Sequence, residues 1–271
     1  MLVEPNSISH GAVKSEAEHR SDICVVGRWM HDRGFVASTD GNISVRLEAD
    51  RILMSPTCMS KGMMTPDDLV VIDFEGRRVG GTRKPSSELA MHLLIYRLRP
   101  DINAICHAHP PTATGYAAAG VALDKPILCE LVMGLGTIPV ARYGTPGTAE
   151  LTTALEPLVR GHESILMANH GVVTYGPDLL TAFLRMETTE HFARVSMITE
   201  ILGKQVLLSG GDLEKLVAAR ARYVAGAHHS APTAAEDLEV SSSGSTERVT
   251  LTRRELDALI DEAVRRDRTL R

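Results

Sequence analysis

The stretch INAICHAHPPT, residues 102–112, joins an apolar run to two histidines and a double proline. Side chains two residues apart in a β-strand leave the same face, so a strand here would direct His107 and His109 to one side. Proline has no backbone N–H and is poorly accommodated inside a sheet, so Pro110 and Pro111 mark the end of the strand. The pattern predicts a strand that presents two imidazoles together at its carboxyl end.

Two neighbouring histidines have two explanations. They form a partly buried pair whose nitrogens are satisfied by hydrogen bonds, or they bind one metal ion, because neutral imidazole is a good ligand for zinc. Zinc needs a third protein ligand, and His170 in LMANHGVV, residues 166–173, is a further histidine at the end of a strand-like run. Three imidazoles with an open fourth position would form a catalytic zinc site.

The segments around these histidines alternate between helical and strand-like periods. Apolar spacing and capping residues predict helices over residues 16–33, 86–99, 110–120, 150–159 and 177–203, and a helix start at 65–68. Strand-like runs cover residues 43–47, 51–55, 69–77, 102–109 and 164–171. We therefore predict a mixed α/β fold, whose hairpins favour an antiparallel or mixed sheet over a doubly wound parallel one.

The composition of the 271 residues, 44% hydrophobic and 23% charged, is that of a globular protein with a substantial core. A net charge of −5 with neutral histidines and dispersed basic residues argue against a nucleic-acid partner. No secretory signal pattern and no run of ~18 apolar residues is found, so we expect a cytoplasmic protein without a membrane partner. The four cysteines lack CxxC spacing, which indicates reduced thiols.

Four segments are predicted along the chain. Residues 1–15 form a flexible leader, 16–225 the folded domain, and 226–248 a linker of small and polar residues. Residues 249–271 have amphipathic spacing behind a capping box, which predicts a short tethered helix. This helix packs on the oligomer or is a solvated tail, or else it resembles the encapsulation peptides that bind shell proteins of bacterial microcompartments.

A carboxylate and a fourth imidazole lie on the helix expected from residue 86. In KPSSELAMH, residues 84–92, Glu88 falls at the start of the helix, where the helix dipole stabilises a negative charge. His92 follows four residues later on the same helical face. We expect His92 to pack or to support a neighbouring group rather than to bind metal.

Small polar residues before two of these elements suit an anion. Ser86 and Ser87 can cap the helix, or can bind a phosphate together with free backbone N–H groups. STDGNIS, residues 38–44, supplies Gly41 and Asn42 either as turn residues alone or as a second wall of that site. The spacing of these residues fits a phosphate site as well as it fits caps and turns.

The chain contains five short motifs in a fixed order: GNIS (41–44), SPT (55–57), KPSSE (84–88), HAH (107–109) and NHG (169–171). Together they resemble the class II aldolase/adducin family, and in particular its L-fuculose-1-phosphate aldolases. The resemblance extends over residues 16 to 205 or so. It implies a single α/β/α domain with a mainly antiparallel central sheet, and a C4 homotetramer with active sites between subunits.

The resemblance also assigns roles to residues by motif. The zinc ligands would be His107, His109 and His170. Glu88 would be the catalytic acid/base, and would approach the metal when substrate is absent. The substrate phosphate would be held by Gly41, Asn42, Thr57, Ser86 and Ser87.

Two positions depart from the family pattern. Cys58 stands where the aldolases often have glycine after the SPT-like threonine. Glu130, in ILCELVMG, aligns with a tyrosine that the fuculose enzyme receives from a neighbouring subunit. A glutamate there is similar to the rhamnulose-1-phosphate branch, and it makes Glu130 a second candidate catalytic residue on the aldehyde side.

The implied activity is that of a zinc-dependent aldehyde-lyase of carbohydrate metabolism. It would cleave a ketose 1-phosphate similar to L-fuculose 1-phosphate into dihydroxyacetone phosphate and an aldehyde, reversibly, with Zn²⁺ stabilising the enediolate. The same scaffold also resembles ribulose-5-phosphate 4-epimerases, sugar-phosphate dehydratases and decarboxylases. A non-catalytic, adducin-like interaction module is a further alternative, although it would not need three metal-binding histidines and an acid.

Overall fold

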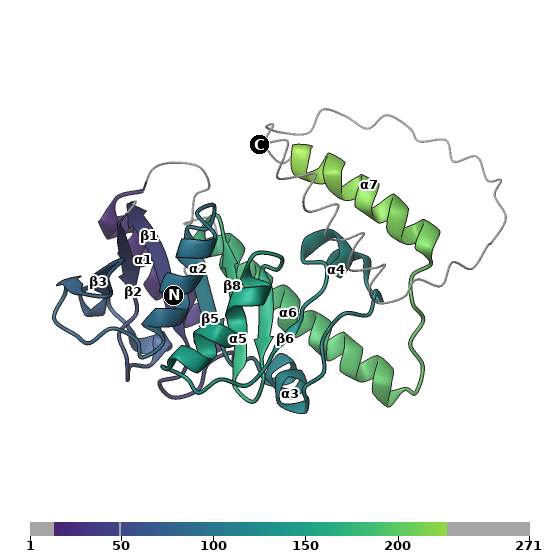
Figure 1. Cartoon of the computed structure of the whole chain (residues 1–271), viewed down its shortest axis with the longest axis horizontal. Coiled ribbons are helices and arrows are strands. Elements are labelled where there is room, and N and C mark those ends of the chain that lie inside the picture. Colours follow the sequence, from purple (N-terminus) through teal and green to yellow (C-terminus); the bar gives the residue numbers. More distant parts are fainter. Residues whose placement is uncertain (1–13, 49, 227–271) are drawn as a thin grey trace. The chain divides into compact units, whose positions relative to one another are not determined.

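The computed structural model describes residues 14–48 and 50–226 (Figure 1). Most of the expected leader, the linker from residue 227 and the tail helix over 249–271 lie outside the described residues, and these expectations stay predictions. The described residues separate into two compact units. One comprises the residues up to Asp124 with Ile138–Gly203, and the other Lys125–Thr137 with the residues from Lys204 onward. Within the described ranges, no helix is both long enough and apolar enough to cross a membrane.

An eight-stranded sheet forms the centre of the first unit, in the order β4-β3-β2-β1-β5-β8-β7-β6. The strands are β1 Asn42–Glu48, β2 Arg51–Met54, β3 Val70–Asp73, β4 Arg78–Gly80, β5 Ala104–Ala108, β6 Val140–Ala141, β7 Ser164–Met167 and β8 Gly171–Gly176. Neighbours pair antiparallel, except β6 and β7, which are parallel. The predicted mixed α/β fold with a mainly antiparallel sheet is confirmed.

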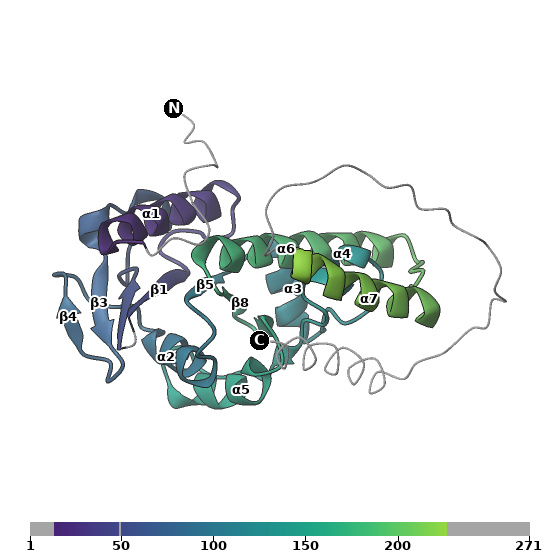
Figure 2. The same ribbon diagram turned by 90° about the horizontal axis from the view of Figure 1, so that it is seen from above.

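Helices cover both faces of this sheet. Figure 2 shows α1 and α6 along one face and α2 and α5 along the other. The helices of the first unit are α1 Glu16–Asp32, α2 Leu89–Leu98, α3 Pro111–Ala119, α5 Ala149–Val159 and α6 Leu179–Ile201. In the second unit, α4 Cys129–Gly134 packs against α7 Gly210–Gly226.

The core between the sheet and helices α2 and α5 gives the site a rigid base. Ile95 of α2, Leu155 of α5 and Ile105 of β5 are fully buried in it. Burial of each such side chain stabilises the fold by about 1.5–3 kcal/mol. All five residues of β5 and all six of β8 are buried, so the two strands that carry the histidine motifs lie in the middle of the packed structure.

The region 65–77 shows where local signals were overridden. Asp68 accepts the backbone N–H of Thr65 at 2.8 Å, so the expected capping box forms. Only a single 3-10 turn, Pro66–Asp68, follows it, because the next residues enter β3 and pair with β2. The predicted strand 69–77 ends at Asp73, since the Asp73 carboxylate accepts backbone N–H groups of the following turn at 3.1 and 2.8 Å.

Candidate active site

Three of the motif segments meet at one end of the sheet. β1 starts at Asn42 and pairs with β5, so that Asn42 lies opposite His107. β5 also pairs with β8, and the short connection between β7 and β8 contains His170. The register of the sheet therefore brings residues from distant parts of the chain to one place.

His107, His109 and His170 form a compact cluster of imidazoles. Their ring centroids lie 4.8 to 5.1 Å apart, and one nitrogen from each ring lies within 4.8 Å of the others. The Nε2 atoms of His107 and His109 are 3.2 Å apart. Two unprotonated nitrogens at this distance repel each other unless a proton or a cation lies between them, so the arrangement suits a metal ion.

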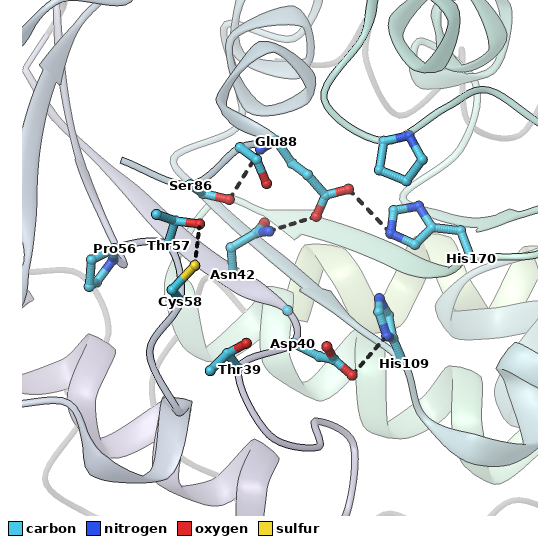
Figure 3. A pocket seen from close by; sticks show the side chains of 13 residues that line it. Thr39, Asp40, Asn42, Pro56, Thr57, Cys58, Ser86, Glu88, His109 and His170 are labelled. Atoms are coloured by element: carbon cyan, nitrogen blue, oxygen red, sulfur yellow. Dashed lines mark hydrogen bonds and ion pairs between the residues drawn. The ribbon is translucent and has the colours of Figure 1, made fainter. Parts of the chain in front are cut away.

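Two of the three rings are oriented by partners on their outer side. Nδ1 of the fully buried His107 donates to the carbonyl oxygen of Val172 at 2.9 Å. Nδ1 of His109 lies 3.5 Å from the carboxylate of Asp40 (Figure 3). Metal-binding histidines usually donate their second N–H in this way, which leaves Nε2 unprotonated. Nδ1 of His170 is buried and has no hydrogen-bond partner among the described residues.

The electrostatics favour neutral rings at two of the three positions. Burial, and then the neighbouring His107, lower the pKa of His170 to about 4, and burial lowers the pKa of His109. Burial also disfavours the charged form of His107, but the Glu88 carboxylate outweighs this effect and raises the pKa of His107. Because neutral imidazole is the form that binds metal, the donor set fits a divalent ion of the zinc type.

Gly171 provides space that His109 occupies. A Cβ at this position would lie 2.4 Å from Cδ2 of His109 and 2.6 Å from the carbonyl oxygen of Ala108. We expect Gly171→Ala to displace His109 and to weaken divalent-metal binding by about 10–100-fold, measured by zinc titration against a chelator. Gly115→Ala in α3, where a Cβ meets nothing within 4 Å, is the matched control. Equal affinities in the two variants would contradict a ligand role for His109.

Glu88 faces the histidines from the start of α2. Its Oε2 lies 3.0 Å from Nε2 of His107 and its Oε1 lies 3.2 Å from Nε2 of His170. Burial disfavours the ionised form, but His107, His170 and a hydrogen bond from Asn42 outweigh it and hold the pKa of Glu88 below its ordinary value. The carboxylate thus points at the same nitrogens that would bind a metal, as expected of an acid that approaches the metal without substrate.

The helix that carries Glu88 starts later than predicted. It begins at Leu89, with Glu88 as its N-cap, and not at Ser86. The Oγ of the buried Ser86 accepts the backbone N–H of Glu88 at 3.2 Å, so residues 86–88 form a turn. This turn places the carboxylate at the positive end of the helix dipole, beside the pocket.

A pocket of about 250 Å³ opens beside Glu88 (Figure 3). It is lined by all the residues predicted to hold phosphate: Gly41, Asn42, Thr57, Ser86 and Ser87. None of the described lining residues is lysine or arginine. A phosphate bound here would therefore rely on hydroxyl groups, backbone N–H groups and a cation in the histidine cluster. The structure brings these residues together, and their individual roles stay predictions.

Two backbone positions of the pocket adopt the left-handed conformation. Gly41 has a φ of +70°, and a Cβ there would lie 2.6 Å from the carbonyl oxygen of His107. Cys58, which replaces a glycine often found in similar aldolases, has a φ of 56°. The backbone at Cys58 therefore keeps the conformation that glycine adopts most readily. Cys58 places an exposed thiol at the wall of the pocket.

Lys61 joins two loops that contribute residues to the pocket, and this contact was not predicted from the sequence. Its side chain is buried, and Nζ donates to the carbonyl oxygen of Thr39 at 3.0 Å and to that of Met59. These carbonyls belong to the loops that precede Gly41 and follow Thr57. A lone lysine at the start of the single 3-10 turn Lys61–Met63 carries no periodic signal, so only the folded structure reveals that it joins these two loops.

Lys61 also makes stability depend on pH. Burial lowers its pKa to about 8, although Asp40 opposes the shift, whereas the pKa of an unfolded lysine is about 10.4. Between these values the unfolded chain binds more protons, so this stability contribution is complete above the unfolded pKa and is lost as the pH falls towards 8. Relative to Lys61→Met, we expect the wild-type free energy of unfolding to rise from pH 8 to 10 by up to ~1.4 kcal/mol per unit.

Urea denaturation across this pH range measures the effect. Lys215→Met is the control, because the Lys215 side chain is 82% exposed. Parallel stability curves for wild type and Lys61→Met would contradict the assigned ionisation of Lys61.

Glu130 belongs to the second unit. It lies in the first turn of α4, and its Oε2 accepts a hydrogen bond from Sγ of Cys129 at 3.2 Å. Its catalytic role stays a prediction.

The fold and this constellation define a class of protein. Residues 21–197 match the family described as the Class II Aldolase and Adducin N-terminal domain. The chain belongs to this family, as its motifs predicted.

Several relatives with named activities are similar to this chain. The 5-deoxy-D-ribulose 1-phosphate aldolase of Bacillus thuringiensis serovar kurstaki is 34% identical over 201 residues, which cover 73% of this chain and 93% of the relative. The 3-oxo-tetronate 4-phosphate decarboxylase of Haemophilus influenzae is 35% identical over 178 residues, with coverages of 63% and 82%. A solved L-fuculose 1-phosphate aldolase has a TM-score of 0.71 and 29% identity, with coverages of 79% and 100%. The relatives include enzymes of two reaction types, aldol cleavage and decarboxylation.

Proposed function

We propose that this protein is a zinc-dependent aldehyde-lyase that cleaves a ketose 1-phosphate, similar to L-fuculose 1-phosphate, into dihydroxyacetone phosphate and an aldehyde. The observation that carries the proposal is the position of Glu88. It points at Nε2 of His107 and His170 beside a pocket that contains the predicted phosphate-binding residues. This reversible reaction requires a metal site, an acid/base residue and a binding site for the phosphate anion.

The residues in and beside the pocket would have different roles in this reaction. The three histidines would hold the metal ion, which when bound would act as a Lewis acid on the substrate carbonyl. The hydroxyl groups of Thr57, Ser86 and Ser87 would orient the phosphate so that the C3–C4 bond lies next to Glu88. When this bond breaks, its electron pair stays on C3, and Glu88 would deliver a proton to that carbon. In the synthetic direction Glu88 would remove the same proton.

The aldehyde side requires a second proton transfer, because the C4 hydroxyl loses its proton as the aldehyde forms. We assign this step to Glu130, supplied by a neighbouring subunit of a homotetramer. Support comes from the aligned tyrosine that the fuculose enzyme uses in this way. The solution mass of the active protein tests the assembly: a fully active monomer would contradict an active site shared between subunits.

Decarboxylation of a 3-oxo-tetronate 4-phosphate is the second candidate, since a decarboxylase with that substrate is 35% identical to this chain. Loss of carbon dioxide also leaves an electron pair on the carbon beside a carbonyl. The same histidines, acid and phosphate seat would therefore serve both reactions.

Product analysis with the zinc-loaded protein decides between these reactions. The substrates are L-fuculose 1-phosphate, 5-deoxy-D-ribulose 1-phosphate, ribulose 5-phosphate and 3-oxo-tetronate 4-phosphate. Release of dihydroxyacetone phosphate supports the aldolase, release of carbon dioxide the decarboxylase, and inversion at C4 without cleavage an epimerase. If no substrate reacts and protein purified without chelator holds no divalent metal, a non-catalytic interaction module is the better explanation.

A further inference from the structure

A chain of buried hydrogen bonds runs from Tyr96 to Glu88, and we call it the His92 relay. The hydroxyl of Tyr96 lies 2.9 Å from Oγ of Ser44, which lies 2.7 Å from Nδ1 of His92. Nε2 of His92 lies 2.5 Å from Oδ1 of Asn42, and Nδ2 of Asn42 donates to Oε2 of Glu88 at 2.8 Å. The exposed fraction of these five residues does not exceed 6%.

The relay forms because a strand and a helix present polar residues at matching intervals. Asn42 and Ser44 are two residues apart in β1 and leave the same face of the strand. Glu88, His92 and Tyr96 are four residues apart along α2 and share one face of the helix. Two strand residues span about 6.6 Å and four helical residues about 6 Å, so the hydrogen bonds alternate between the two elements with the same repeat.

The direction of every hydrogen bond in the relay follows from one end. Asn42 donates from its NH₂ group to Oε2 of Glu88, so its Oδ1 is left as an acceptor. His92 must then carry its proton on Nε2 and accept at Nδ1 from Ser44, which in turn accepts from Tyr96. Burial lowers the pKa of His92 to about 3, so this ring is neutral and has one acceptor nitrogen.

The two carboxylate oxygens of Glu88 have different surroundings. Oε2 accepts a hydrogen bond from Asn42, whereas Oε1 accepts none within the described residues and lies 3.2 Å from Nε2 of His170, on the side of the histidine cluster. An amide that could rotate would offer its oxygen to Glu88 in half of its orientations, and two acceptors would then face each other. His92 prevents this rotation, because its Nε2–H can bond only to the oxygen of Asn42.

We propose that His92 is a positioning residue that fixes the Asn42 amide, so that Asn42 occupies Oε2 of Glu88 and leaves Oε1 as the oxygen that exchanges a proton with the substrate carbon. The role of Oε1 rests on the proposed function. The direction of the relay does not, because it follows from the hydrogen bonds alone.

Two substitutions at one position separate positioning from packing. The amide nitrogen of glutamine can take the place of Nε2, so His92→Gln keeps a donor for Asn42 and should retain kcat close to wild type. The shorter His92→Asn keeps contact on the Ser44 side only, and its kcat should fall by about 10–100-fold with KM and metal content unchanged. Equal losses in both variants would assign His92 to packing, and an unchanged kcat in His92→Asn would overturn the proposal.

The tautomer of His92 provides a test without substrate. Long-range ¹⁵N–¹H spectra of the full zinc-loaded chain should show the His92 proton on Nε2. The signal is identified by its loss in His92→Gln, or by its shift in Tyr96→Phe if the first variant does not fold. A proton on Nδ1 overturns the relay. A protein that has the Nε2–H tautomer but converts none of the sugar phosphates would retain the relay and lose the proposed function.

Discussion

Replacing His107 with alanine is expected to remove the bound divalent metal and to lower kcat/KM by more than about 100-fold. His107 is fully buried and oriented by Val172 on the neighbouring strand, so alanine at this position removes an imidazole that the fold holds in place. Two imidazoles alone leave the metal short of the three protein ligands of a catalytic site. Loss of a group that merely supports a ligand costs about 10–100-fold, and loss of the ligand itself should cost more.

The test compares metal content by mass spectrometry with kcat/KM in protein purified without chelator. His107→Gln keeps most of the side-chain volume and separates loss of the ligand from creation of a cavity. His191→Ala, at an exposed position of α6, should retain metal and activity. Full activity in both His107→Ala and His109→Ala would return the histidine pair to a structural role at the end of a strand.

Local sequence patterns were sufficient to predict that the two histidines lie at the end of a strand. Alternation along a strand and the following prolines depend only on neighbouring residues, and β5 presents His107 as expected. The approach of His170 was inferred from the ligands that zinc requires, without a known sheet register. The register β1-β5-β8-β7 then brings His170 to the pair.

Contacts between elements could not be predicted in the same way. The bond from Asn42 to Glu88 depends on how β1 lies against α2, and no period in either segment specifies that placement. Lys61 donates hydrogen bonds to carbonyl groups of two loops. Every residue has a backbone carbonyl, so the sequence does not indicate which carbonyl groups accept them. Glu130 is harder still, because its proposed role depends on the assembly of subunits.

Helix-capping residues show the same difference between what local sequence determines and what tertiary packing determines. Ser86 and the pair of Thr65 and Asp68 were recognised as polar groups suited to helix starts, and each makes local hydrogen bonds. The capping box at 65–68 nevertheless leads into one 3-10 turn, because pairing of β3 with β2 takes the residues that follow. A cap is a local property, whereas the length of the helix behind it depends on tertiary packing.

Glu88→Gln is expected to keep the bound metal and to lower kcat by about 10²–10⁴-fold. Glutamine has nearly the same size and can still accept the hydrogen bond from Asn42, so the pocket and the histidines should keep their positions. It cannot take a proton from carbon or return one to it. Affinity for substrate should change little, because the phosphate seat is formed by other side chains.

Metal content and steady-state kinetics of Glu88→Gln distinguish three roles for this carboxylate. Retained metal with lost turnover supports an acid/base that exchanges a proton with the substrate. Loss of metal as well would make Glu88 a ligand, which its distances of 3.0 and 3.2 Å to the histidine nitrogens also allow. Retained turnover would reduce Glu88 to the N-cap of α2. Glu156→Gln, at an exposed position of α5, should leave both measurements unchanged, so that any loss in Glu88→Gln arises from the place of this carboxylate between Asn42 and the histidines.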